Sequence, residues 1–447
     1  MPKTAGALRG RHDAYDHLRH QMLDALKERS LDADNPAHAQ AISDLAGDVV
    51  ERYQREARTG LGSLALANPP DMVARLIRSV INWGVLTDLL ERRDVEEIFI
   101  RGRDVWYLDS AGGLQNIEEP TTEGELMGIV NRLLRTAGRT VDQRVPMVQT
   151  QVLGGSARLG VIIPPIADAL SATIRKYTLR NETLDVLVER GSLTRQAAVL
   201  LDAIVGIRAG VLVSGPMGAG KTAMLNALVR AMPPAHRVLG CEVTRELSAP
   251  LFHGDYYQTR QVGVGSKGET EISLRDLVYQ CLGMRADTLV VGEVRGPEAY
   301  ELTRAGNAGC SLLCTIHANG PREAMNALVN TALLAGENVP AAQISAVFAD
   351  IIDLVVHLDR EDLAFRDAAE GGHIRRQVME IAAVPPLQGS ERSFTMEPLF
   401  TRDHIGAPLR WTGAFPSGSL RPRLERALKA KGTSLEKVFE GRLRRAQ

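Results

Sequence analysis

The amino-acid sequence predicts an α/β protein in which the main domain is built on a parallel sheet. A smaller α+β domain and a helical N-terminal extension precede it. The first observation is a set of five short apolar runs that alternate with helix-like stretches between residues 185 and 360. Strands buried on both faces of a parallel sheet have this pattern. The runs are GVLVSG (210–215), RVLGCEV (237–243), TLVVGEV (288–294), SLLCTIH (311–317) and DLVVHL (353–358).

The second observation is the mixed pattern that comes before these runs. Residues 95–117 contain short strand-like pieces separated by turns, the second of them at Gly112–Gly113. Residues 123–138 have the spacing of an amphipathic helix, and 147–165 have the pattern of a hairpin with a Gly-Gly turn. We therefore expect a small α+β domain over 84–178. The stretch 171–191 is expected to link it to the main domain.

The third observation concerns the two ends of the chain. Residues 1–83 show helical spacing, in 41–57 and 71–83, without a strand signal, so we expect a helical N-terminal extension. Residues 361–447 contain two strand-like runs and a basic helix, and they are expected to extend the main domain over 179–360. A chain of 447 residues is too long for one ordinary core, which agrees with several domains.

Composition narrows the function classes. The formal net charge is -1 and the chain has 19 aromatic residues (3 Trp, 8 Tyr and 8 Phe), so no nucleic-acid partner is expected. The four cysteines lack paired spacing with histidines, which disfavours a zinc site and favours a reduced compartment. No apolar run approaches the ~20 residues that cross a bilayer, and the first twenty residues do not resemble a signal peptide. We expect a cytoplasmic protein that reaches a membrane through partners.

The stretch GPMGAGKT (215–222) has the pattern of a phosphate-binding loop, G-x-x-x-x-G-K-[ST], between a buried strand and a helix former. Glycines allow successive backbone N–H groups to surround phosphate oxygens, and the following helix adds its positive N-terminal end. Lys221 is expected to contact the β- and γ-phosphates, and the Thr222 hydroxyl to bind Mg²⁺. The candidate nucleotide-binding residues are Gly215, Pro216, Met217, Gly218, Ala219, Gly220, Lys221, Thr222 and Ala223.

Three chemically active side chains end other apolar runs. Glu242, Glu293 and His317 each stand at the end of a predicted parallel strand. Ligands bind beyond the carboxyl ends of such strands, so we expect these side chains to meet the loop at one edge of the sheet. Taken singly, a strand-end glutamate or histidine is also compatible with a structural role. Gly292 stands where a metal-holding aspartate is usual, directly before Glu293.

The ordered motifs resemble the secretion-superfamily ATPases, and within them the CpaF/TadA family of tight-adherence (Flp-type) pilus motors. The resemblance is carried by the loop, by SLRDLVYQCLGMRADTLVVGEVRG (273–296) and by TIHANGPREAMNAL (315–328). In the first domain it is carried by PMV (146–148), ARLGVIIPP (157–165) and ATIRKY (172–177). It covers about residues 75–430 and implies a RecA-like P-loop ATPase core that binds ATP and Mg²⁺.

The resemblance also implies roles by position. Glu242 is expected to polarise the attacking water, Glu293 to help hold Mg²⁺, and His317 to sense the γ-phosphate or contact the neighbouring domain. Arg275 and Arg285 match arginines around the active site, while Arg158 and Arg175 of the first domain match candidate arginine fingers. Each of these arginines is equally compatible with a solvated or salt-bridge role.

At the level of assembly, the resemblance implies a homohexamer that works at the inner face of the cell membrane with inner-membrane platform proteins. It would drive pilus assembly, with retraction as a further possibility. Three alternatives stay open: a conjugation or type IV secretion ATPase, a retraction motor, and an ATP-binding scaffold subunit that hydrolyses weakly. The scaffold alternative is supported by Val243, which replaces the second acid of a usual acidic pair, with Arg245 nearby.

Overall fold

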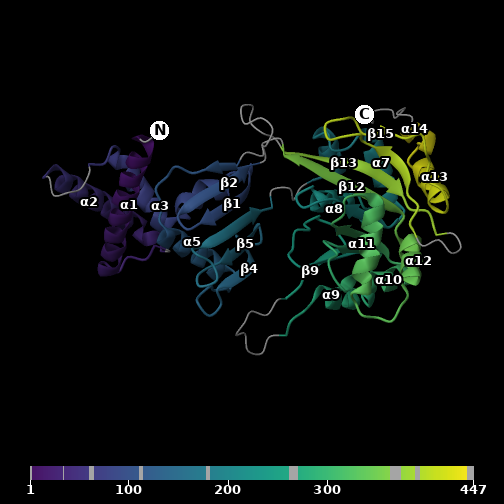
Figure 1. Ribbon diagram of the computed structural model, residues 1–447, viewed down its shortest axis with the longest axis horizontal. Helices are drawn as coiled ribbons and strands as arrows, with labels where there is room; N and C mark the ends of the chain where they lie inside the picture. Colours follow the sequence, from purple (N-terminus) through teal and green to yellow (C-terminus); the bar gives the residue numbers. More distant parts are fainter. Residues whose placement is uncertain are drawn as a thin grey trace. The chain divides into compact units, whose positions relative to one another are not determined.

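The computed structural model describes residues 3–33, 35–59, 65–109, 114–177, 182–260, 270–362, 374–387 and 393–439. The chain divides into two compact units, Met1–Thr178 and Leu179–Gln447, which are described separately (Figure 1). Among the described residues, no helix combines the length and apolar character needed to cross a bilayer. The predicted turn at Gly112–Gly113 lies outside the described residues.

Unit 1 begins with three helices that share an apolar core. They are α1 (Lys3–Glu28), α2 (Ala39–Arg58) and α3 (Pro69–Ile81), with a short 3-10 turn η1 (Pro36–His38) before α2. The side chains at helical spacing face one another, among them Leu18, Leu45 and Leu76, which are fully buried. Asn68 caps α3, since its side chain accepts a hydrogen bond from the Asp71 N–H, and the two prolines occupy the first helical positions.

An antiparallel sheet with the strand order β3-β2-β1-β6-β5-β4 forms the rest of unit 1. Its apolar face packs against α5. The predicted hairpin joins β4 to β5, and Gly154 and Gly155 take left-handed conformations in its turn, which residues without a Cβ adopt readily. The elements are η2 (Gly84–Leu86), α4 (Thr87–Glu91), β1 (Val95–Arg101), β2 (Asp104–Asp109), β3 (Leu114–Asn116), α5 (Glu123–Thr136), β4 (Met147–Val152), β5 (Ala157–Ile162) and β6 (Ser171–Lys176).

A buried ionic cluster joins the helices to this sheet domain. The Glu125 carboxylate on α5 accepts hydrogen bonds from the Tyr15 hydroxyl at 2.6 Å and from the Arg75 guanidinium at 2.8 Å. Arg75 also donates to the backbone carbonyl of Pro120 at 2.9 Å. The helical segment and the sheet domain are therefore connected by side chains from α1, α3 and α5 within one compact unit.

Unit 2 is built on a nine-stranded sheet with the order β15-β14-β13-β12-β7-β11-β10-β8-β9. The strands from β12 to β9 in this order are parallel, whereas β13, β14 and β15 join the β12 side as antiparallel strands. The strands are β7 (Val211–Ser214), β8 (Val238–Glu242), β9 (Gly254–Gln258), β10 (Thr288–Val291), β11 (Ser311–Ile316), β12 (Leu354–Asp362), β13 (Ile374–Ala383), β14 (Glu397–Thr401) and β15 (Arg410–Trp411).

Helices cover both faces of this sheet, as the continuous apolar runs predict. Val211 and Val213 enter one core, with α6, α7, α8, α13 and α14, while Leu212 enters the other, with α9 to α12. Figure 1 shows α10, α11 and α12 grouped on one side of the sheet. The helices are α6 (Leu184–Glu189), α7 (Arg195–Gly206), α8 (Lys221–Arg230), α9 (Leu274–Leu282), α10 (Glu298–Asn307), α11 (Pro321–Leu333), α12 (Ala341–Ile351), α13 (Leu420–Ala430) and α14 (Leu435–Phe439).

The topology confirms the predicted α/β class, with a smaller α+β domain and a helical extension before the parallel sheet. One expectation needs correction. The stretch 171–191, expected as a linker, contains β6, which is a central strand of the first sheet, and α6, which is part of the second core. The tail adds β13, β14 and β15 to the same sheet, and β12 runs across residue 360, so the boundary drawn there falls inside a strand.

Candidate functional site

The loop from Gly215 to Thr222 connects β7 to α8 and has the conformation that its glycines allow. Gly215, Gly218 and Gly220 have φ angles of 149°, 75° and 92°, in the region that favours residues without a Cβ. Gly220 caps the helix, and α8 begins at Lys221. The loop therefore stands at the N-terminal, positive end of a ten-residue helix, the usual position for an anion such as a phosphate.

Lys221 is buried, and its ammonium group donates to acceptors in the loop itself and on the strand end that carries His317. It contacts the backbone carbonyls of Gly215 and Pro216, both at 2.9 Å, and lies 3.2 Å from His317 Nδ1. Because an ammonium group has donors and no acceptor, His317 Nδ1 must accept in this contact. These three acceptors hold the lysine ammonium group beside the loop. A bound phosphate would offer oxygen atoms that can replace them.

His317 links the lysine to Glu293. Burial first, and then the Lys221 charge, lower the pKa of His317 below its ordinary value, so the ring is neutral at pH 7. With Nδ1 as the acceptor, the ring proton is on Nε2, which lies 2.5 Å from Glu293 Oε1. Arg295 contacts the other oxygen of the same carboxylate. Of the three strand-end side chains expected at the loop, His317 and Glu293 join it in a chain of contacts that starts at Lys221. Glu242 is not part of that chain and lies against Gly292.

Glu242 lies at the end of β8 and is almost completely buried, with 3% of its surface exposed. Its carboxylate accepts hydrogen bonds from the N–H groups of Glu246 and Leu247, at 3.1 and 3.0 Å for the nearer oxygen. Burial nevertheless outweighs these bonds and raises the pKa of Glu242 to about 8. A carboxyl group with this pKa is matched to proton transfer near neutral pH.

The packing around Gly292 explains why no aspartate stands directly before Glu293. A Cβ at this position would lie 2.7 Å from Glu242 Cγ and 2.8 Å from its Oε1, far inside ordinary contact distance. Glycine is therefore required here so that the Glu242 side chain can lie against the backbone directly after β10. The sequence shows the replacement, but the reason for it lies in the packing between neighbouring strands.

The remaining loop residues differ in exposure. Met217 points to solvent, with 66% of its surface exposed, while Ala219 and Ala223 are buried and Pro216 is partly buried. Thr222, partly buried, follows Lys221 in the first turn of α8.

Arg275 and Arg285 lie apart from this cluster within the chain. Arg275 forms ion pairs with Glu301 at 2.9 Å and with Glu337 at 3.0 Å. Arg285 is exposed and precedes β10, so it lies at the amino end of a strand whose carboxyl end carries Glu293.

Arg158 and Arg175 are neighbours in unit 1. They are directly opposite each other on β5 and β6, and Arg175 lies 3.6 Å from Glu97 on β1. Both alternate with buried residues of these strands, so they project from the sheet face that α5 does not cover. Two like charges directly opposite each other are unfavourable without an anion, and Glu97 offsets this in part.

The edge of the sheet also fits a magnesium ion bound together with a nucleotide. Mg²⁺ is usually held by one or two protein oxygen groups, with phosphate oxygens and waters completing its shell. Among the described residues there is no group of three or more His, Cys, Asp or Glu side chains that could hold a metal ion. Thr222 and Glu293 are the residues that would hold the ion, which would supply positive charge to the phosphate oxygens.

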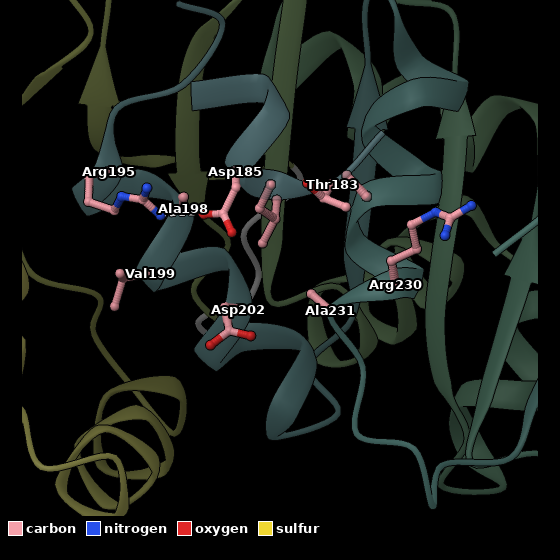
Figure 2. Close-up of a pocket in the computed structure, with 10 residues that line it drawn as sticks. Thr183, Asp185, Arg195, Ala198, Val199, Asp202, Arg230 and Ala231 are labelled. Carbon is pink, nitrogen blue, oxygen red and sulfur yellow. Dashed lines mark hydrogen bonds and ion pairs between the residues drawn. The ribbon is translucent and has the colours of Figure 1, made fainter. Parts of the chain in front are cut away.

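A separate cavity of about 390 Å³ lies between α6, α7 and the end of α8 (Figure 2). Arg230 and Ala231, at the C-terminal end of α8, help to line it, about 14 Å along the helix from Lys221. Both of its aspartates are paired: Asp185 contacts Arg195, and Asp202 contacts Lys431. Figure 2 shows the Arg230 side chain turned away from both aspartates. This cavity is distinct from the phosphate loop.

Several residues around the loop were not predicted from sequence. Arg295 is two positions from Glu293, and a motif-based search could have included it. Ser214 Oγ lies 3.0 Å from His357 Nδ1, and Arg376 Nε donates to the Gly218 carbonyl at 2.9 Å. These last contacts join residues that are 143 and 158 positions apart in the chain, so no local pattern indicates them.

The parallel sheet and the glycine-lysine loop between β7 and α8 define an α/β protein with a phosphate-loop conformation. Comparison with known proteins gives the family. Residues 85–377 match the family described as type II/IV secretion system protein, and the chain belongs to that family.

Two relatives and one solved structure illustrate the range of similarity. A putative conjugal transfer protein of Mycobacterium tuberculosis is 31% identical over 309 residues, covering 67% of this chain and 87% of the relative. The type IV secretion system protein PtlH of Bordetella pertussis is 27% identical over 319 residues, covering 65% and 91%. The ATPase DotB of Legionella pneumophila is 18% identical, with coverage of 66% and 79% and a TM-score of 0.45.

Proposed function

We propose that this chain is the ATP-hydrolysing motor subunit of a pilus or secretion apparatus, with a tight-adherence (Flp-type) pilus as the machine it powers. Membership of the secretion family supports the general class. The resemblance of residues 273–296 and 315–328 to tight-adherence motors supports the finer assignment. The observation that carries ATP hydrolysis is the contact chain from Lys221 through His317 to Glu293 beside the phosphate loop.

Each side chain has a chemical task in this proposal. Lys221 and the N–H groups of the loop bind the phosphates, and Lys221 exchanges its carbonyl partners for phosphate oxygens. Glu242 takes the proton of the attacking water, since its raised pKa makes it an effective base in its ionised form. His317 contacts Lys221 through one ring nitrogen and Glu293 through the other. A movement of the lysine toward phosphate would therefore change the contacts of Glu293.

The arginines of the proposal act across subunits. We propose a homohexamer in which Arg158 and Arg175 stabilise charge at the γ-phosphate, as arginine fingers do. Arg275 and Arg285 would act at the site of a neighbouring copy. In this arrangement ATP favours the form of the ring in which these arginines reach the nucleotide, because its γ-phosphate makes contacts in that form alone. Such differential contacts are how a ligand shifts a conformational equilibrium. The work would be passed to inner-membrane platform proteins at the cytoplasmic face.

Phosphate release by the purified full chain tests the enzymatic part. We expect Mg²⁺-dependent turnover that falls to background in Lys221→Ala and in Glu293→Gln. Lys429→Ala and Glu425→Gln, on the exposed face of α13, repeat the same charge changes far from the loop and should match the wild type. Turnover of the wild type no greater than that of Lys221→Ala contradicts the motor. It would favour a scaffold subunit, to which exposed Val243 in place of an acid also points.

A second candidate machine is a conjugation or type IV secretion apparatus, because the relatives at 31% and 27% identity carry those names. A deletion strain separates the candidates. Loss of surface pili, restored by the wild-type gene and not by Lys221→Ala, supports the pilus. Intact pili with loss of DNA transfer or of protein export supports the second candidate instead.

A further inference from the structure

The phosphate loop lies against the antiparallel ribbon of β12 and β13 along most of its length. At its start, Ser214 contacts His357 of β12, and a Cβ on Gly215 would lie 2.3 Å from the Leu358 carbonyl oxygen. Further on, a Cβ on Gly218 would lie 2.3 Å from Arg360 Nη1. The glycines therefore serve two purposes: they permit the left-handed backbone, and they allow the ribbon to approach it.

Two arginines of the ribbon face the middle of the loop. Arg360 on β12 and Arg376 on β13 are directly opposite each other in the register of the two strands. Arg376 Nε donates to the Gly218 carbonyl at 2.9 Å, and its Cδ lies 3.8 Å from the place of a Cβ on Gly220.

The contact with Gly218 fixes more than the carbonyl. A peptide unit is planar and trans, so the Gly218 carbonyl and the Ala219 N–H point in opposite directions. With the carbonyl held toward Arg376, the Ala219 N–H points to the other side of the loop. There it is 3.4 Å from the Pro216 carbonyl oxygen, the same oxygen that the Lys221 ammonium contacts. Arg376 thus directs a backbone donor toward the lysine side.

We propose that Arg376 is a positioning residue of the nucleotide site, and that the β12–β13 ribbon holds the phosphate loop in its binding conformation. By holding the Gly218 carbonyl, Arg376 presents the Ala219 N–H to the phosphate that Lys221 binds, and Arg360 adds a second positive charge behind the loop. The inference rests on the proposed nucleotide site, and it assigns a task to an element 158 residues away in sequence.

Two substitutions at one position separate the hydrogen bond from the charge. Arg376→Gln places an N–H donor the same number of bonds from Cα as Arg Nε, and it removes the charge. Arg376→Met keeps a stem of similar length without any donor. Arg375→Met is the matched control, because Arg375 is exposed and adjacent on the same strand, where side chains alternate between faces.

The full chain is titrated with Mg²⁺–ATP and with ADP, and kcat and KM are measured separately. We expect Arg376→Met to weaken nucleotide binding and raise KM about tenfold, equivalent to about 1.4 kcal/mol, with kcat changed less than threefold. Arg376→Gln should stay within threefold of the wild type, and Arg375→Met should match it. Thermal unfolding without nucleotide checks folding, and hydrogen exchange of residues 215–222 reports the loop directly.

Several results would overturn the inference. Equal nucleotide affinity in the wild type and in both Arg376 variants removes the positioning role. An equal loss in Arg376→Gln and Arg376→Met shows that the charge acts, not the bond to Gly218. If Arg376→Met folds poorly, Arg376→Gln decides. Because Arg376→Gln keeps the donor to Gly218, faster hydrogen exchange of residues 215–222 in this variant than in the wild type contradicts the proposal. A wild type that binds neither nucleotide overturns the proposed function itself.

Discussion

Replacing Gly292 with alanine should disable hydrolysis while leaving nucleotide binding intact. The new Cβ would lie 2.7 Å from Glu242 Cγ, whereas carbon atoms in contact prefer about 3.5 Å or more. The Glu242 side chain must therefore move by roughly 0.8 Å or more. Its present bonds to the Leu247 and Glu246 N–H groups, 3.0 and 3.1 Å long, would then exceed hydrogen-bond length.

The size of the effect follows from that displacement. A catalytic group misplaced by about 1 Å costs roughly a hundredfold in rate, so we expect kcat to fall about that much. Overpacking of a buried site also costs about 1–3 kcal/mol of stability. The three atoms nearest to a Cβ at position 292 all belong to Glu242 and none to the phosphate loop. The affinity for nucleotide should therefore change less than threefold.

The assay combines phosphate release, a nucleotide titration and thermal unfolding of the same preparation. Gly206→Ala is the control, because it is the last residue of α7 and a Cβ there meets nothing within 4 Å. If Gly292→Ala retains kcat within threefold of the wild type, Glu242 is not the base, or its position is not set by β10. Equal losses of binding and of kcat would show that the whole site had collapsed instead.

Four further predictions concern pH and stability. The kcat of the wild type should rise between pH 6.5 and 8.5 with a midpoint near the pKa of Glu242, about 8; a flat profile contradicts the role of this base. Burial raises that pKa from 4.5, so the folded chain keeps this proton to a higher pH than the unfolded chain does. The free energy of unfolding of the nucleotide-free protein, measured by urea titration, should therefore fall between about pH 4.5 and 8. This fall should be absent in Glu242→Gln. Glu125→Ala should lower the stability of the full chain by about 3–5 kcal/mol, because it leaves the Arg75 guanidinium buried without its carboxylate; a loss under 1 kcal/mol by calorimetry would be inconsistent with a buried pair. Gly210→Ala should lower Tm, since its Cβ would lie 1.9 Å from the Ile351 carbonyl oxygen, and an unchanged Tm would contradict that packing.

Local sequence patterns were sufficient for the parallel sheet and for the edge at which the site lies. Continuous apolar runs indicated strands such as β7 and β10, because burial on both faces leaves no polar alternation. The glycine-lysine motif located the loop, and the rule for carboxyl ends brought Glu293 and His317 to it. The edge strand β9 was missed, since its half-exposed residues GDYYQ lack a continuous apolar run.

The unpredicted parts depend on contacts between distant residues. The bond from Arg376 to Gly218 arises because β12 and β13 pair beside β7, and a single sequence does not specify strand order. The need for Gly292 likewise comes from the neighbouring strand β8, which carries Glu242. The linker expected over 171–191 was too wide, because the polar residues of β6 alternate with buried Ala172 and Ile174 and conceal a central strand.

The most direct test of a nucleotide-driven motor is a crystal structure of the full chain with Mg²⁺ and a non-hydrolysable ATP analogue. We predict that the Lys221 ammonium leaves the Gly215 and Pro216 carbonyls for the β- and γ-phosphates, with Glu242 and Glu293 facing the terminal phosphate. An analogue bound away from the loop, or a lysine still on those carbonyls beside an occupied loop, would contradict it.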